Sequence, residues 1–255
     1  MLTLASDFGS PYPAAMKGVL RSRGVADLVD VAHDLPQGDP RAAAFWLRFV
    51  LPEFPPGVHL VVVDPGVGTD RAAVCVRAGE HALVGPDNGV LLPPARRIAA
   101  ETPVAAASDA AGGIEIFAWD YDDPASATFH GRDVFAPAAA TVHEAGVDAV
   151  ASLDAVSLVE SVAPGDAPES AVDCRFPDAE VSAAAARGEV LVVDDFGNAI
   201  TNVPGSFLDG GDGDEIDVNG ERAPVVRAFA EVAAGERLVT VGSHGYVECD
   251  VNRGR

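Results

Sequence analysis

The chain has 255 residues, of which 48% are hydrophobic, so it can bury the core of one large or two modest domains. Its 39 acidic residues against 17 basic ones give a formal net charge of −22, which argues against nucleic acid or an anionic membrane as a partner. No apolar run reaches the roughly 18 residues of a membrane span, and no basic segment followed by an apolar stretch opens the chain, so we expect a cytoplasmic protein.

The acidic residues are spread along the chain rather than collected in a tail, and Lys17 is the only lysine. Their mutual repulsion destabilises a compact chain at low ionic strength and is screened in high salt. The charge therefore indicates a halophilic protein from a salt-adapted cytoplasm. The three cysteines are far apart, and Cys75 and Cys249 lie in strand-like sequence, where we expect them to be small buried hydrophobic residues.

Strands and helices alternate in the first half of the sequence. Strands are predicted over 2–6, 28–32, a run ending at Asp64, 73–76, 82–84 and 114–119, and helices over 13–24, 39–51 and 134–146. Asp39 is the expected N-cap of the second helix, and Gly24 and Gly146 are expected stops. This alternation predicts an α/β domain with a mostly parallel sheet and flanking helices over residues 1–160.

The second half differs from the first in composition and in the pattern of predicted elements. Residues 163–187 are rich in Pro, Ala, Glu and Asp and are typical of a linker or a long surface excursion. Short strands are then predicted over 189–193, 199–203, 215–218, 237–241 and 246–251, with a glycine-rich loop at 208–215. We therefore predict a linker and a small all-β domain, a barrel or compact antiparallel sheet, over residues 161–255.

Polar side chains follow several predicted strands. Asp64 ends the run LVVVD and is followed by a Pro-Gly turn and by Arg71; Asp7, His33, Asp87 and His130 hold similar positions. Taken alone, the first of these is also compatible with an ordinary surface Asp in a turn. Together they predict a crevice, because the carboxyl ends of parallel strands share one edge of the sheet.

The ligand of this crevice is less defined. No glycine-rich phosphate loop and no His or Cys spacing typical of zinc is present. Asp7, Asp64, Asp87 and His130 could in principle hold a hard or borderline metal, but we expect neither a metal nor a cofactor. In the second half, Phe196 and Asn198 form a pair suited to binding a flat heterocycle, because an aromatic ring can stack on its face and an amide can hydrogen-bond its edge. The alternative is an ordinary turn with a buried Phe.

The order of these motifs resembles one family. The segments 3–9, 15–18, 30–33, 63–71, 85–89, 129–137 and 196–202 are similar to those of the S-adenosyl-L-methionine (SAM) hydroxide adenosyltransferases, the SAM hydrolases related to the fluorinating and chlorinating enzymes. The resemblance implies an α/β domain, a C-terminal β-barrel, and a homotrimer that binds SAM between domains of neighbouring subunits. The implied reaction is SAM plus water giving adenosine and methionine.

The resemblance also implies roles for individual residues. Asp64, Arg71 and His130 match the catalytic positions, and Asp7 matches the ligand of the ribose diol. Substrate contacts are implied for Asp194, near the methionine amine, for Val251 through its backbone, and for Phe196, Asn198, Ser243 and Glu248. Two departures stand out: His244 follows Ser243, and the sequence ends at Arg255 without the expected small-residue tail.

The residue types suit hydrolysis. The sulfonium of SAM is a good leaving group, so a protein needs chiefly to position a water molecule in line and to accept its proton. We expect Arg71 to lower the pKa of Asp64, which leaves open which group takes that proton. Two alternatives are a halogenase, disfavoured because Asp64 would repel a halide, and a sensor that binds SAM or adenosine without turnover.

Overall fold

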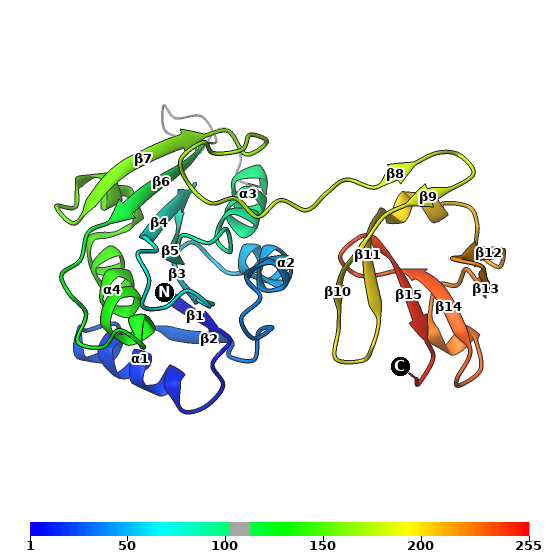
Figure 1. Cartoon of the computed structure of the whole chain (residues 1–255), viewed down its shortest axis with the longest axis horizontal. Coiled ribbons are helices and arrows are strands. Elements are labelled where there is room, and N and C mark those ends of the chain that lie inside the picture. The colour runs from blue at the N-terminus through cyan, green and yellow to red at the C-terminus, as the bar shows by residue number, and fades with distance from the viewer. Residues whose placement is uncertain (102–112, 255) are drawn as a thin grey trace. The chain divides into compact units, whose positions relative to one another are not determined.

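The computed structural model describes residues 1–101 and 113–254 (Figure 1). They form two compact units, Met1–Cys174 and Arg175–Arg255. The predicted domain boundary between residues 160 and 161 stays a prediction about independent folding. No helix of the described residues is both long and apolar enough to cross a membrane.

The first unit is built on a seven-stranded sheet with the order β2-β1-β3-β5-β4-β6-β7. The first four strands in this order are parallel, and β4, β6 and β7 each run antiparallel to their neighbours. The predicted α/β unit is confirmed, with a sheet that is parallel on one side and antiparallel on the other. Its strands are β1 (Leu2–Ser6), β2 (Leu28–Ala32), β3 (Val58–Val62), β4 (Ala73–Ala78), β5 (His81–Pro86), β6 (Ile114–Trp119) and β7 (Val156–Val162).

Helices cover both faces of this sheet. α1 (Tyr12–Ser22) and α4 (Ala136–Ala145) pack together on one face, and α2 (Pro40–Val50) and α3 (Leu92–Glu101) pack together on the other (Figure 1). The side chain of Asp39 accepts a hydrogen bond from the amide of Ala42, as expected of an N-cap. Short 3-10 turns lie at Leu51–Glu53 and Val147–Ser152, and a π-helical turn at Gly131–Phe135 leads into α4.

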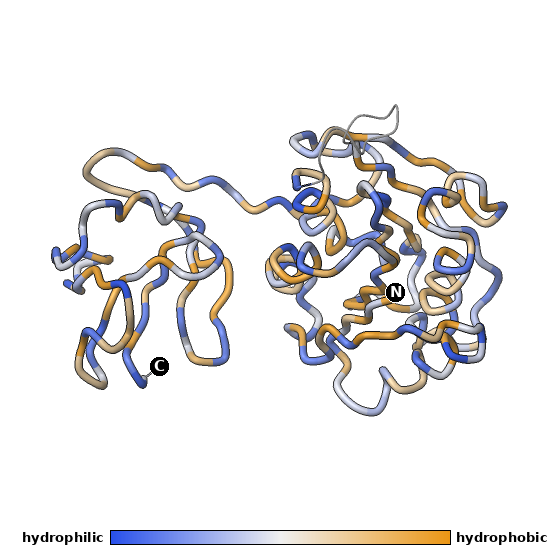
Figure 2. The backbone as a smooth tube through the Cα atoms, turned by 180° about the vertical axis from the view of Figure 1, so that it is seen from behind, coloured by the Kyte–Doolittle hydropathy of each residue, from blue (hydrophilic) through white to orange (hydrophobic). Residues whose placement is uncertain are grey.

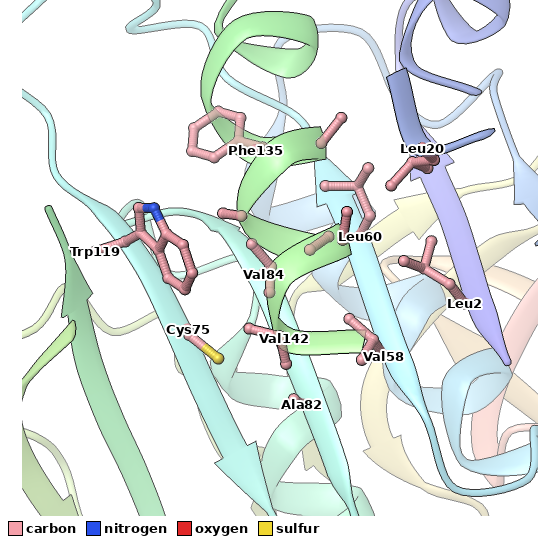
Figure 3. Packing of buried hydrophobic residues seen from close by; sticks show 14 of the residues in the cluster. Leu2, Leu20, Val58, Leu60, Cys75, Ala82, Val84, Trp119, Phe135 and Val142 are labelled. Carbon is pink, nitrogen blue, oxygen red and sulfur yellow. The ribbon is translucent and has the colours of Figure 1, made fainter. Parts of the chain in front are cut away.

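The core under α1 and α4 explains why the strands consist of valine and leucine runs. Alternate side chains of β1, β3 and β5 meet α4 there: Figure 3 shows Leu2, Val58, Leu60 and Val84 from the strands beside Val142 from the helix. Both faces of the central strands are covered, so the whole of β3 is buried. Figure 2 shows the same pattern, with hydrophobic segments running through the central strands and hydrophilic colour frequent in the connections.

The second unit is all-β, as predicted. β10 (Val190–Val193), β11 (Ala199–Pro204), β15 (Tyr246–Val251) and β14 (Arg237–Val241) form an antiparallel sheet in that order, with β10 and β14 at its edges. Two hairpins accompany it, β8 (Glu180–Val181) with β9 (Ala186–Arg187) and β12 (Glu215–Val218) with β13 (Glu221–Pro224). Further 3-10 turns lie at Gly205–Leu208 and Phe229–Glu231. One face of the main sheet packs on a small core around Val225, Val239 and Val247.

Part of the predicted linker is tied to the first unit. The amide of Val172 donates a hydrogen bond to Asp87, and Arg96 makes a bidentate ion pair with Asp173 at 2.7 Å. Cys75 is buried, as predicted, and burial raises the pKa of its thiol to about 12. Cys249 is half-buried against the core of the second unit.

Candidate active site

The polar loops of the first unit meet at one edge of the sheet. β1, β2, β3 and β5 are parallel, and β6 has the same direction because it is separated from β5 by the antiparallel β4. The loops after β1, β3 and β6 border a cavity of about 450 Å³, a size typical of small-molecule sites. Its lining residues are Phe8, Tyr12, Gln37, Val62, Asp64, Val67, Ser126, Thr128, Phe129, His130, Gly131, Arg132 and Phe135.

Asp64 contributes a buried carboxylate to this cavity. Its side chain is 5% exposed, and Oδ1 accepts a hydrogen bond from the amide of Gly66 at 3.1 Å. Burial raises the pKa of Asp64, and this effect outweighs the opposing effects of Arg71, the Gly66 amide and His130. The expectation that Arg71 would leave Asp64 with a lowered pKa is therefore wrong, because the removal of water from around the carboxylate has the stronger influence on its ionisation.

Arg71 lies beside Asp64 and contacts one of its two carboxylate oxygens. Nη1 of Arg71 is 3.3 Å from Oδ1 of Asp64, which is an ion pair. The turn between them needs a glycine, because a Cβ at Gly66 would overlap the guanidinium group of Arg71. Gly68 has a φ of +80°, the left-handed conformation that glycine adopts without strain. The Pro-Gly turn after β3 thus holds a guanidinium against a buried carboxylate.

His130 enters the cavity at the start of the π-helical turn. It is 6% exposed, and its ring contacts Tyr121 and Phe135 edge-on, with centroid distances of 6.3 and 6.4 Å. π-Helical turns are frequent at functional sites, where they re-aim a side chain within a helix. Gly131 is needed next to it, because a Cβ there would lie 2.9 Å from Sδ of Met16.

The two carboxylate oxygens of Asp7 differ in their hydrogen bonding. Oδ2 accepts a hydrogen bond from the amide of Gly38 at 2.8 Å, whereas Oδ1 is buried and has no hydrogen-bond partner among the described residues. A carboxylate oxygen left in this state can accept a hydrogen bond from a ligand hydroxyl. His33, just after β2, is hydrogen-bonded to Ser6, the residue before Asp7, and so supports the same loop.

The structure does not bring all four candidate metal ligands together. Asp87 accepts a hydrogen bond from Val172 at 2.9 Å and does not line the cavity. Over residues 1–101 and 113–254, no three His, Cys, Asp or Glu side chains form a group that could hold a metal ion.

The candidate residues of the second unit group around the turn after β10. Asp194 accepts hydrogen bonds from the amides of Phe196 and Asn198 through Oδ1 and from the Asn198 side chain through Oδ2. The Phe196 side chain stands 79% exposed on this turn, so the alternative was wrong about its burial, whereas the turn itself is present, with the Gly197 amide bonded to the Asp194 carbonyl at 2.9 Å. A large aromatic ring left in water at such a turn is available to a partner or ligand.

Glu248 lies in β15 and is buried. Its Oε1 is 2.8 Å from Nε2 of His244. The residue that departs from the family pattern is therefore the partner of a predicted substrate-binding residue. Ser243 lies in the turn before β15, and Val251 is the last residue of that strand.

Two features of these regions were missed in the sequence. One is the aromatic cluster of Phe8, Tyr12 and Phe129, whose rings meet edge-on at 5.4–6.1 Å along the cavity wall. The other is Asp250, which alternates with Glu248 in β15 and is 4% exposed. The signal for Asp250 was present, since two acids spaced by one residue in a strand must lie on the same face.

Comparison with known proteins relates both parts of the chain to one family. Residues 2–151 match the SAM hydroxide adenosyltransferase N-terminal domain, and residues 188–255 match the C-terminal domain of the same family. Two curated relatives are the (R)-S-adenosyl-L-methionine hydrolases of Thermus thermophilus, 42% identical over 98% of this chain and 91% of its own length, and of Salinispora tropica, 38% identical over 100% and 91%.

Solved structures show the same fold. The crystal structure of a conserved protein from Thermotoga maritima has a TM-score of 0.75 and 31% identity, and covers 100% of this chain and 94% of its own. That of a conserved protein from Thermus thermophilus has a TM-score of 0.68 and 36% identity, and covers 99% and 92%.

Proposed function

The chain belongs to the SAM hydroxide adenosyltransferase family, and we propose that it is an enzyme that hydrolyses SAM to adenosine and L-methionine. The observation that carries this proposal is the buried Asp64 carboxylate, held at a strand end in a cavity that also contains His130. The reaction needs no cofactor, because SAM itself carries the leaving group.

The reaction balances with water as the nucleophile. The water oxygen attacks C5′ of the ribose, the C5′–S bond breaks, and its electron pair stays on sulfur, which becomes the neutral thioether of methionine. One proton leaves the attacking water. We assign its acceptance to Asp64, because burial raises the pKa of this carboxyl and so makes it a stronger base than an exposed Asp.

Arg71 and His130 have supporting roles in this proposal. Arg71, 3.3 Å from Asp64, holds the carboxylate in one orientation. His130, enclosed by Tyr121 and Phe135, hydrogen-bonds the water from a second side. Two fixed partners restrict the water to the line of attack, which is the positioning effect that dominates such displacements. A halide has no comparable place beside Asp64, since two anions in a desolvated cavity repel each other.

We assign the substrate contacts as follows. The unpartnered oxygen of Asp7 accepts hydrogen bonds from the ribose diol. In the second unit, Phe196 stacks on adenine and Asn198 bonds its edge, in support of which the ring is exposed and the amide is fixed by Asp194. Further contacts come from Asp194, Ser243, Glu248 and the backbone of Val251.

We further propose that the substrate is the (R)-sulfonium diastereomer, because curated relatives up to 42% identical are named for it. The enzyme is a homotrimer of a salt-adapted cytoplasm in this proposal. The trimer rests on the family resemblance, and the salt adaptation on the net charge of −22. Sedimentation equilibrium tests the first of these, and separated diastereomers assayed in parallel test the substrate.

The main test uses Asp64→Asn with Asp70→Asn as a matched control, since Asp70 is an exposed acid of the same loop. We expect Asp64→Asn to lower the turnover of SAM to adenosine by at least about a hundredfold, the low end of what a positioned base contributes. Its adenosine affinity should be unchanged, and Asp70→Asn should behave as wild type. Arg71→Ala and His130→Ala should lower turnover in the same direction and combine non-additively with Asp64→Asn.

Labelled water identifies the nucleophile. With wild type in H₂¹⁸O, the label should appear on the 5′ oxygen of adenosine, and molar chloride should give no 5′-chloro product. If wild type forms no adenosine from either diastereomer, the hydrolase assignment fails and a SAM or adenosine sensor replaces it.

A further inference from the structure

Asp250 is a buried acid without an evident structural purpose. It lies in β15, is 4% exposed, and both of its carboxylate oxygens are buried without a hydrogen-bond partner among the described residues. Ionisation of a carboxyl in such a place opposes folding, because burial removes its charge from solvent and the neighbouring acids Glu248 and Asp194 repel it, which outweighs the backbone of Ala199 as a donor. Such a group needs a ligand to explain it.

The strand pattern defines what Asp250 faces. Val247 and Cys249 turn toward the small core of the second unit, so Glu248 and Asp250 lie together on the opposite face of β15. The neighbouring position on β14 is Leu238, which is apolar. On the other side β11 pairs Ala199 with Cys249, and the same register brings Asn198 next to Asp250. Asp250 therefore lies among the side chains assigned to the substrate.

Asp250 shares this surface with two other acids, Glu248 and Asp194. Burial, together with the negative charges of Glu248 and Asp194, raises the pKa of Asp250 to about 7. Among the described contacts of these acids, Glu248 is paired with Nε2 of His244. No metal-binding group of three such side chains exists among the described residues, so a tightly coordinated ion does not explain the cluster. A ligand that brings one positive charge and several hydrogen-bond donors does.

We propose that Asp250, with Asp194, binds the α-ammonium group of the methionine half of the substrate. A primary ammonium has three donors and one charge, which suits two carboxylates that form no metal site. This inference rests on SAM being the substrate and names a residue that adds to the specificity of the enzyme for an amino acid. The role is binding: Asp250 does not touch the C5′–S bond.

The test compares two ligands that the enzyme does not cleave and that differ in one group. S-adenosyl-L-homocysteine carries the α-ammonium, and 5′-S-(3-carboxypropyl)-5′-thioadenosine lacks it; neither has a sulfonium. In calorimetric titrations we expect Asp250→Asn to weaken S-adenosyl-L-homocysteine by about tenfold or more, as for other charge-assisted hydrogen bonds. The affinity for the carboxypropyl compound should change less than about twofold, since its missing ammonium is the group assigned to Asp250. Asp209→Asn, an exposed acid of the same unit, is the control.

Each other outcome overturns the assignment. Equal losses for both ligands indicate a structural role, and no loss for either means that Asp250 does not contact the ligand. A raised KM for SAM with unchanged affinity for S-adenosyl-L-homocysteine would place Asp250 against the sulfonium. Because the titrations need no turnover, they separate this inference from the proposed function: a wild type that binds as expected but makes no adenosine refutes the hydrolase alone.

A measurement on the wild type covers the case that Asp250→Asn does not fold. Binding a cation beside Asp250 must lower the pKa of this carboxyl and so release a proton at about pH 6–7. Titrations in two buffers of different ionisation enthalpy should therefore show proton release with S-adenosyl-L-homocysteine and none with the carboxypropyl compound. Equal proton release with both ligands refutes the proposal.

Discussion

Asp250→Asn should make the protein more stable above neutral pH, although the same change weakens its ligand. The pKa of Asp250 is about 7 in the folded chain, against an ordinary value of 3.8 for Asp. A group whose folded pKa is raised contributes stability that is fully present below its unfolded pKa and is lost as the pH rises through its folded pKa. The window for Asp250 is therefore about pH 4 to 7.

The size of the effect follows from these two values. At about 1.36 kcal/mol per pH unit, ionising Asp250 destabilises the fold by at most about 4 kcal/mol, and we expect about 2–4 kcal/mol because Glu248 shares the repulsion. Asn has nearly the same shape as the protonated acid, so wild type and variant should be equally stable near pH 4. By pH 8 the variant should be the more stable one by that amount.

Urea unfolding measured by circular dichroism from pH 4 to pH 8, at one fixed salt concentration, gives the two curves. Asp209→Asn should follow wild type, since Asp209 is exposed. If the free energies of unfolding of wild type and Asp250→Asn stay parallel across the whole range, the carboxyl is not desolvated and the argument for its ligand fails as well.

Three further predictions concern other parts of the chain. Lowering the salt from molar to about a tenth molar should lower the melting temperature, because the Debye length grows from about 3 to about 10 Å; a melting temperature independent of salt would refute salt adaptation. Asp7→Ala and Asn198→Ala should each weaken adenosine by roughly 1–3 kcal/mol in calorimetry, and unchanged affinities would return both residues to structural roles. Gly66→Ala should displace Arg71 and reduce turnover by up to about a hundredfold with adenosine affinity retained, whereas Gly18→Ala, where a Cβ meets no neighbour, should not; equal activities would remove Arg71 from the site.

Much of the fold could be predicted from apolar runs and their stops. The valine run before Asp64 and the glycine after α4 identify a buried strand and a helix end without any tertiary information. The antiparallel direction of β4 relative to β5 could also have been predicted, because the two residues between Ala78 and His81 allow only a hairpin and not a parallel crossover. α3 was missed because Pro93 and Pro94 suggest a break, whereas they occupy the first turn of the helix, where prolines are tolerated.

The edge strand β7 was missed for another reason. Its side chains Leu158 and Val159 are exposed, so no alternation of buried and exposed positions marks it. Only its pairing with β6 makes it a strand. A sequence holds no local signal for an element that is stabilised by a neighbour far away in the chain.

The candidate site, too, could be predicted only in part. That Asp64 and His130 share a cavity could be predicted, because a mostly parallel sheet brings the carboxyl ends of its strands to one edge. The sign of the pKa shift of Asp64 could not, because it depends on how much water the fold removes from the carboxylate. Charges can be counted in a sequence, whereas burial can be measured only in a structure.

Burial also separates two uses of acidic residues in one chain. The surplus that gives −22 is spread along the sequence, where salt screens it, but Asp64 and Asp250 are desolvated and screened far less. The two effects should therefore be independent: Asp250→Asn should keep the salt dependence of wild type, and molar salt should leave the pH dependence of wild type between about pH 4 and 7 in place. If molar salt removed that pH dependence, Asp250 would belong with the surface acids, and its ammonium ligand would no longer be needed to explain it.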